Sequence, residues 1–279
     1  MGQDGYPRAP TQEEWNALSP EEQARVVEEL PGEVTDAEMS PPEGDLHFQA
    51  KVTALDTLRG HFTRQRRRAY LAAELPVYYP DERRFAPDLL IVLDADAQER
   101  SKWLVSAEGK GLDFVLEVHV GGDRKKDAEE NVARYARLGI PEYFIYDRGR
   151  QRLFGYRLPK PEARVYVRMK PRAGVLVSER LGLELRLEEG RLRFYSGREM
   201  LLEPEEVIGR LEQLTEGLQR RVDEESRQTA EARRQASEAR KQASESESRL
   251  EAERRLRLEE QRQNTELRAE LERLKKGRG

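Results

Sequence analysis

Two acidic residues, Asp88 and Glu117, stand beside and inside segments that are otherwise apolar. Asp88 opens the run LLIVL, and Glu117 interrupts FVLEVHV. A carboxylate in a buried strand is costly unless it is paired or binds a cation. Carboxylates on neighbouring strands can hold a hard divalent ion such as Mg²⁺ and leave positions for water and a phosphate oxygen. Because such an ion activates water and stabilises charge on phosphate, the chemistry indicated is phosphodiester hydrolysis.

This chemistry also needs a positive charge near the metal, to orient water and offset charge in the transition state. Because side chains alternate along a strand, Glu117 and His119 are expected to share one face, opposite Leu116. The candidates for the positive charge are His119, acting as a base or ligand, and Lys125 or Lys126, reaching in from the start of the following helix. An arginine could also take the role.

Each of these residues also has a purely structural interpretation. Asp88 could cap a turn at the end of a sheet, and Glu117 could pair with an arginine. His119 could be a satisfied core histidine, while Lys125 and Lys126 follow an arginine and could lie in a solvent-exposed turn. The two carboxylates together favour a metal site more than either does alone.

Composition limits the kinds of site and partner that the chain can have. Hydrophobic and charged residues each make up 37% of its 279 residues, and it contains no cysteine and three histidines. Carboxylates must therefore supply most metal ligands. The net charge of −4 opposes non-specific attachment to nucleic acid. A local basic patch, Arg64 with Arg66, Arg67 and Arg68, could override that average or could be an exposed helix end.

Neither a membrane span nor a signal peptide is predicted. No stretch approaches the roughly 18 apolar residues that span a bilayer, and the N-terminus MGQDGYPRAP lacks an apolar core. We therefore expect a cytoplasmic protein without a membrane partner.

Helices and strands can be placed around the two acidic residues. Residues 11–30 predict two short helices, each with a capping box, and residues 45–62 predict a longer helix. A further helix over residues 125–138 should end at Gly139. The remaining segments up to residue 202 resemble strands: AYLAAELPVYY, PDLLIVLD, LDFVLEVHV, EYFIYD, RLFGYRL, ARVYVRMK and GLELRLEEGRLRFY. This order predicts an α/β fold with a mixed sheet flanked by helices.

The C-terminal segment has a different character. After Pro204 there is no proline, and Glu, Arg, Ala, Gln, Ser and Leu dominate, which predicts one long helix. Apolar residues near both of its ends alternate steps of four and three, which is typical of a coiled coil. We expect residues 205–279 to support a homo-oligomer, with a weaker, alanine-lined middle.

The residues around both carboxylates resemble a known family. Pro87-Asp88 followed by Glu117-Val118-His119 resembles the PD-(D/E)XK signature of restriction-endonuclease-like proteins. The similarity to the Uma-type family of putative restriction endonucleases rests on DFVLEV, Asp127, Tyr135, ARLGIPEYFIYD, GYRL, Trp103 before Gly109, and LGLELRLEEGRLRFYS. It implies a restriction-endonuclease-like fold, DNA as substrate, and Mg²⁺ or Mn²⁺ held by Asp88 and Glu117.

The sequence departs from this family where the family places its catalytic lysine. That lysine follows an aspartate matching Asp127 by four residues, and Asn131 stands there. Members usually have Ser or Thr in place of His119. Asp88, Glu117, His119 and Lys126 are therefore the predicted catalytic residues of a metal-dependent DNA endonuclease. The alternative is a catalytically decayed domain that serves as a binding or assembly module through its coiled coil, and a third is a coiled-coil protein with a globular cap.

The predicted organisation has three parts. A helical lead-in covers residues 1–40, a nuclease-like domain covers 41–202, and a charged coiled-coil helix covers 203–279. Two aromatic residues of the middle part are assigned structural roles, Trp103 as the anchor of a surface loop and Tyr135 in helix-to-sheet packing.

Overall fold

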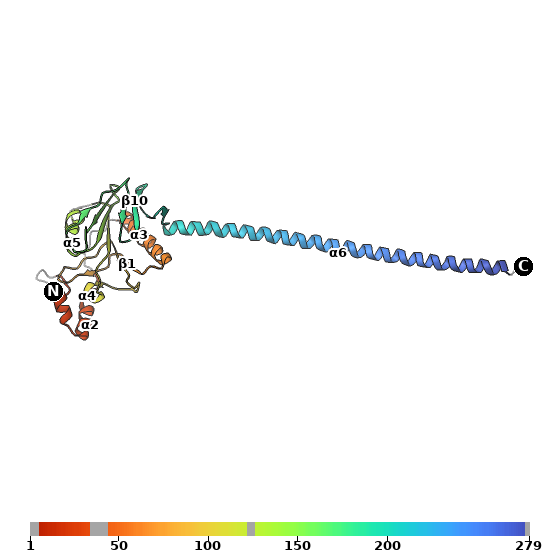
Figure 1. Ribbon diagram of the computed structural model, residues 1–279, viewed down its shortest axis with the longest axis horizontal. Coiled ribbons are helices and arrows are strands. Elements are labelled where there is room, and N and C mark those ends of the chain that lie inside the picture. Colours follow the sequence, from red (N-terminus) through yellow and green to blue (C-terminus); the bar gives the residue numbers. More distant parts are fainter. Residues whose placement is uncertain (1–5, 34–43, 122–125, 277–279) are drawn as a thin grey trace. The chain divides into compact units, whose positions relative to one another are not determined.

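The computed structural model describes residues 6–33, 44–121 and 126–276, and its chain divides into two units, Met1–Ile208 and Gly209–Gly279. Side chains are described except at 126–128, 272 and 274–276. Figure 1 shows that the first unit contains all the strands and that the second is helical. The mixed α/β fold with a long C-terminal helix is the one predicted from the sequence.

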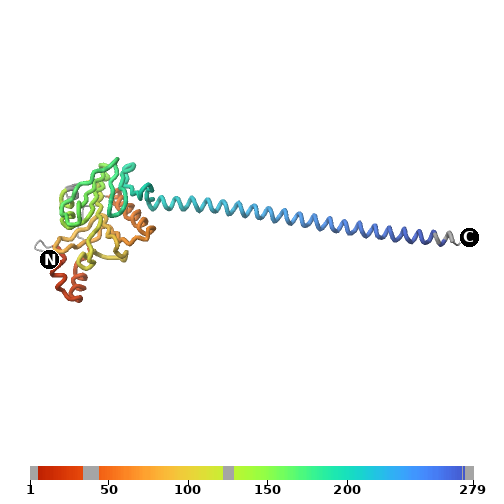
Figure 2. Tube along the Cα trace, viewed as in Figure 1, coloured from red at the N-terminus to blue at the C-terminus, as the bar shows by residue number. Residues whose placement is uncertain are grey.

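The first unit begins with two short helices, α1 (Gln12–Ala17) and α2 (Pro20–Glu29). Both have the predicted capping boxes, with Thr11 and Ser19 as N-caps. Trp15 of α1 is buried in a small core with Tyr78 and Leu104. Figure 2 shows this segment in red at one edge of the unit. The helices are thus an integral part of the first unit.

A six-stranded mixed sheet forms the centre of the unit, in the order β1-β3-β5-β6-β7-β8. β5 pairs in parallel with β6, and the other neighbours are antiparallel. The strands are β1 (Ala69–Ala72), β3 (Leu89–Leu93), β5 (Phe114–His119), β6 (Glu142–Asp147), β7 (Arg152–Arg157) and β8 (Val167–Arg168). β5 therefore lies between β3 and β6, with both edges paired.

One face of this sheet packs against helix α3 (Gly44–Gln65) and a second, antiparallel sheet. The order of that sheet is β12-β11-β10-β9. Leu58 of α3 and Leu116 of β5 belong to the core between these layers. The strands of the second sheet are β9 (Leu176–Ser178), β10 (Leu183–Glu188), β11 (Arg191–Ser196) and β12 (Glu199–Met200). Glu189 and Gly190, both with positive φ, form the predicted turn between β10 and β11.

The opposite face packs against a second core that contains Val115, Tyr135 and Trp103. On this side of the sheet lies a two-stranded parallel sheet of β2 (Val77–Tyr78) and β4 (Trp103–Leu104). Strand β4 is followed by the single helical turn α4 (Val105–Glu108). Trp103, predicted to anchor a surface loop, lies in β4, and its indole N–H donates to the carbonyl oxygen of Lys110 at 2.9 Å. Its side chain is 1% exposed and stacks on Tyr70, with ring centroids 5.0 Å apart.

The helix predicted over 125–138 is not α-helical throughout. Lys126–Asn131 forms a π-helix, η1, and Val132–Arg137 forms the α-helix α5. A π-helix bonds each residue to the fifth along the chain, which changes the rotational spacing of its side chains. Gly139 has φ +76, as its predicted place after the helix requires.

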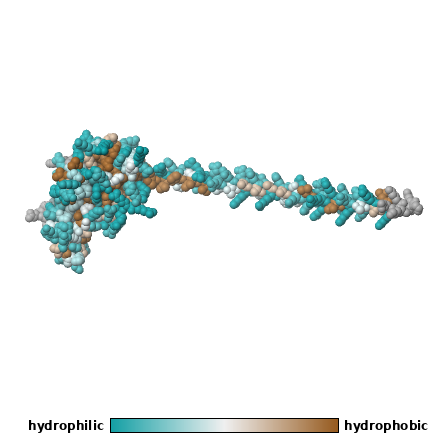
Figure 3. Space-filling view, in the orientation of Figure 1, coloured by the Kyte–Doolittle hydropathy of each residue, from teal (hydrophilic) through white to brown (hydrophobic). Residues whose placement is uncertain are grey.

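The C-terminal helix α6 (Pro204–Lys276) has 73 residues. Within the second unit, large apolar side chains along it are more than half exposed, including Leu211, Leu218 and Leu267. Figure 3 shows apolar residues spaced along its otherwise hydrophilic surface. The part of the chain that the structure describes has no helix long and apolar enough to cross a membrane.

Candidate active site between strands β3 and β5

Asp88 and Glu117 lie next to each other on neighbouring strands. Leu89 is opposite Leu116 in the antiparallel pair β3–β5, so one step further Asp88 meets Glu117. The backbone N–H of Asp88 donates to Oε2 of Glu117 at 3.1 Å, and the N–H of Val118 donates to Oδ2 of Asp88 at 2.8 Å. The two carboxylates thus lie next to each other at one end of the β3–β5 pair.

Glu117 is 7% exposed and is held on a second side by the helix that follows β5. The hydroxyl group of Tyr135 in α5 donates to Oε1 of Glu117 at 2.9 Å. The ring of Tyr135 also packs edge-on against Tyr143, with centroids 5.0 Å apart. Tyr135 therefore packs helix against sheet, as predicted, and orients the glutamate as well.

Asp88 is held by helix α3. Nε2 of His47 lies 3.1 Å from Oδ2 of Asp88, with both side chains about 15% exposed. Burial alone would raise the pKa of the Asp88 carboxyl group, but the hydrogen bond and charge of His47 and the N–H of Val118 hold that pKa below its ordinary value. Asp88 is therefore ionised, and able to bind a cation, over a wider pH range than an ordinary aspartate.

The chemistry of these side chains fits a divalent metal ion. Mg²⁺ is usually bound through one or two carboxylates, with water and phosphate oxygens completing its coordination. Asp88 and Glu117 supply two carboxylates on a rigid pair of strands. No group of three or more acidic or histidine side chains suited to a metal is found among the described residues. Water and substrate would have to provide the remaining ligands.

The candidates for the positive charge are placed less directly. His119 is 3% exposed at the end of β5, where it is paired in register with Asp147 of β6. Asn131, at the family's lysine position, is 5% exposed at the end of η1. Lys125 and the side chain of Lys126 lie outside the described residues. Both Glu117 and His119 lie in β5, so the alternation of side chains along a strand puts them on one face.

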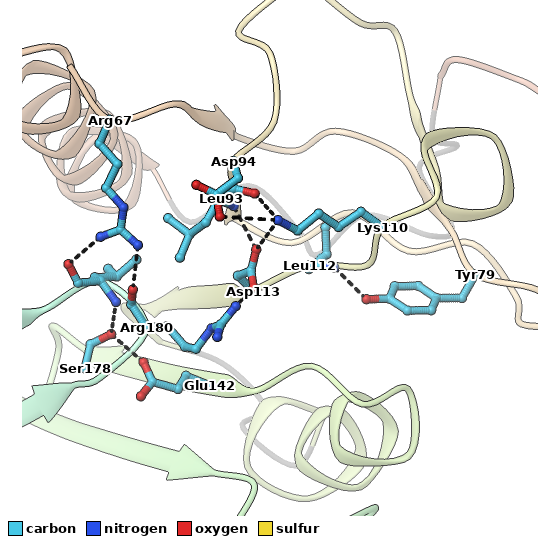
Figure 4. A network of polar contacts seen from close by, with 11 residues as sticks. Arg67, Tyr79, Leu93, Asp94, Lys110, Leu112, Asp113, Glu142, Ser178 and Arg180 are labelled. Carbon is cyan, nitrogen blue, oxygen red and sulfur yellow. Dashed lines mark hydrogen bonds and ion pairs between the residues drawn. The ribbon is translucent and has the colours of Figure 1, made fainter. Parts of the chain in front are cut away.

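The arginine cluster lies away from this site, and two of its members have partners within the unit. Arg67 donates to the backbone carbonyl oxygens of Arg180 and Leu181, and Arg68 pairs with Asp96 at 2.7 Å. Figure 4 shows Arg67 near a network around Asp113, which precedes β5 and is therefore at the strand's other end from Glu117. In this part of the chain the structure supports local structural roles for Arg67 and Arg68.

Sequence reasoning missed two residues of α3, His47, which contacts Asp88, and Lys51, which lies one turn further along the helix. Lys51 is 4% exposed, and its Nζ donates to Glu74. His47 and Lys51 are four residues apart and share a face of the helix. The signal available in the sequence was this polar pair on a helix expected to pack against the core. Contacts to residues 23 and 41 positions away could not be inferred from that spacing.

This chain is similar to a family of known proteins and to solved structures. The family described as Uma2, putative restriction endonuclease, matches residues 12–188. A crystal structure of a putative nuclease belonging to DUF820 from Anabaena variabilis is 16% identical, with a TM-score of 0.40, over 52% of this chain and 78% of that chain. The comparison with curated proteins found no match.

Proposed function

The chain belongs to the Uma2 family of putative restriction endonucleases, and on that premise we propose that it is a metal-dependent nuclease that hydrolyses phosphodiester bonds in DNA. The observation that carries the proposal is the direct contact between Asp88 and Glu117 across β3 and β5. Their contacts include backbone N–H groups, the hydroxyl group of Tyr135 and the imidazole ring of His47.

The residues of the site have distinct tasks in this reaction. Asp88 and Glu117 would hold Mg²⁺ or Mn²⁺, and a bound ion of this kind supplies Lewis acidity and an activated water molecule. Tyr135 orients Glu117, and His47 orients Asp88. In the hydrolysis, a water oxygen replaces one ester oxygen on phosphorus, and the leaving oxygen keeps the bonding electrons and takes a proton.

The test is metal binding by calorimetry together with plasmid nicking, on the wild type and on Asp88→Asn and Glu117→Gln. Both substitutions keep the shape of the side chain and remove its charge. Asp94→Asn is the matched control, because Asp94 follows the other end of β3 and its side chain is 78% exposed. We expect both site variants to lose metal binding and nicking, and the control to keep them. A wild type that folds but neither binds metal nor nicks DNA would refute the proposal.

A second proposal concerns helix α6, through which two copies of the chain associate as a coiled coil. Six apolar residues of α6 after Ile208 are 55–60% exposed and recur at two positions of a seven-residue repeat. One position is occupied by Leu211, Leu218 and Leu267. The other, four residues further along the repeat, is occupied by Val222, Leu250 and Leu271. An isolated helix would leave this seam in water. If the domain were catalytically decayed, a role in assembly would depend on this association through α6.

Light scattering tests the association. The full chain is expected to have twice the mass of one chain, and a protein ending at Ile208 the mass of one chain. Leu218→Asn with Leu267→Asn, on the seam, should also give single chains, whereas Gln219→Asn with Arg268→Lys, at the next positions, should not. Single-chain mass for the full-length protein would exclude the coiled coil.

A further inference from the structure

We propose that Lys51 of helix α3 supplies the positive charge beside Asp88 and Glu117 that the sequence lacks at residue 131. This inference rests on the proposed nuclease function and assigns a residue that acts in it. Cleavage of a phosphodiester needs a fixed cation where negative charge increases in the transition state. Asn131 is an amide and cannot provide that charge.

The strands place a third acidic residue next to the pair already described. Ala72 is opposite Leu90 in the antiparallel pair β1–β3, so the chain after β1 runs beside the residues before β3. The N–H of Glu74 donates to the carbonyl oxygen of Pro87 at 2.9 Å. Glu74 therefore lies across from Asp88, and Glu117 lies on β5, on the other side of β3.

Helix α3 carries two basic residues, one turn apart, that contact two of these acidic residues. His47 contacts Asp88, and Lys51 contacts Glu74. α3 also contacts β1 and β5 directly. α3 therefore brings one basic side chain to Asp88 and another to Glu74, the residue across from Asp88.

The burial of the Lys51–Glu74 pair is uneven, which distinguishes it from an ordinary surface salt bridge. The side chain of Lys51 is 6% exposed, while that of Glu74 is 51% exposed. Buried lysines are rare, because desolvation of an ammonium ion is costly. Glu74 can turn into solvent when an anion arrives, whereas Lys51 stays in place, so a phosphate group could take over the role of Glu74 as the partner of Lys51.

A third contact fixes the first turn of α3 against the site. The guanidinium group of Arg148, just after β6, donates to the carbonyl oxygen of Leu46, and the backbone N–H of Arg148 donates to the carbonyl oxygen of His119 at 2.8 Å. The start of α3 is thereby joined to the end of β5. A cation carried by this helix is held in place before substrate binds, as electrostatic stabilisation of a transition state requires.

The experiment compares Lys51→Met with Glu74→Gln and with Lys102→Met. Lys102 is the matched control, because it is also a partly buried lysine but donates to the carbonyl oxygen of Leu30, beside α2. We expect Lys51→Met to bind Mg²⁺ and to nick plasmid DNA on the order of 100-fold more slowly or worse. Glu74→Gln keeps Lys51 and should nick DNA, and Lys102→Met should match the wild type.

Two further measurements separate a charge that acts on the substrate from one that only supports the fold. In the Lys51→Met background, Asn131→Lys should restore nicking, because it returns the charge to the family's position. Binding of a short DNA duplex in Ca²⁺ should show a salt dependence reduced by about one phosphate contact in Lys51→Met. Equal losses of nicking in Lys51→Met and Glu74→Gln would mean that the ion pair matters only for structure.

The outcomes distinguish this inference from the proposed function. A wild type that nicks DNA, with Lys51→Met nicking it equally well, would overturn the role of Lys51 and leave the nuclease standing, with His119 or Lys126 as the source of the charge. A wild type without nicking or metal binding would overturn both proposals.

Discussion

The hydrogen bond between Tyr135 and Glu117 gives the most direct quantitative prediction, through the substitution Tyr135→Phe. The ring is 2% exposed, so phenylalanine fills the same space and only the hydroxyl group is lost. That hydroxyl donates to Oε1 of Glu117 at 2.9 Å. Hydrogen bonds to charged groups contribute about 1.5–3 kcal/mol. For a unit of this size, each kcal/mol lowers Tm by about 2–4 °C, so a fall of about 3–12 °C is expected.

Tryptophan fluorescence during thermal and urea unfolding measures this loss in the full chain. Trp15 and Trp103, the two tryptophans, are both buried in the first unit, so their signal is independent of the long helix. Tyr146→Phe is the control: its hydroxyl donates to the backbone carbonyl oxygen of Gly190, and a neutral bond contributes about 0.5–1.5 kcal/mol.

A double-mutant cycle decides whether Glu117 is the cause. In a Glu117→Gln background, Tyr135→Phe should cost clearly less than in the wild type, because the charged acceptor is gone. Equal costs in both backgrounds, or a cost no larger than that of Tyr146→Phe, would show that the hydroxyl group of Tyr135 does not hold the glutamate.

Two other predictions concern the stability of the first unit. Burial, followed by the charges of Arg64 and Arg67, lowers the pKa of His61 below its ordinary value of 6.5. As the pH falls, His61 is therefore protonated in the unfolded chain before it is protonated in the folded chain. Stability should fall as the pH drops below about 6.5, and urea midpoints at pH 7.5 and 5.0 should differ less in His61→Gln than in the wild type; an equal difference would contradict this. Glu142 is 1% exposed and accepts from the Ser178 hydroxyl group and, at 2.9 Å, from the N–H of Glu179, so Glu142→Ala should lower the free energy of unfolding by about 1–3 kcal/mol, because these donors lose their buried acceptor. A urea-derived loss under 1 kcal/mol would contradict that burial.

The local signals in the sequence predicted local structure well. Thr11 and Ser19 cap their helices through atoms within three residues, so their pattern is sufficient to define the helix starts. Alternation in FVLEVHV likewise placed Leu116 and Val115 on opposite faces, where they belong to different cores. In both cases the determining contacts are between neighbours in the sequence or follow from strand geometry alone.

Features set by distant contacts could not be predicted in this way. Trp103 follows the polar pair Ser101-Lys102, and its burial involves stacking on Tyr70 and the guanidinium group of Arg100 over its ring, 4.8 Å from the centroid. In the π-helix η1 each hydrogen bond spans one residue more than in an α-helix, a difference that apolar spacing over six residues does not resolve. His47 was missed for a similar reason, because its partner Asp88 is 41 residues away.

Hydrogen bonds and an ion pair hold strand β5 at both ends, and this determines how the site can respond to a ligand. At one end Asp113 accepts from the N–H of Leu93 at 2.8 Å and pairs with Arg180, while at the other Glu117 is held by Tyr135 and the backbone of Asp88. With both edges paired as well, the strand has no free end from which to fray. Its amide hydrogens are expected to exchange with deuterium only when the whole unit unfolds. Adjustment to a substrate must therefore come from side chains around a strand that keeps its position.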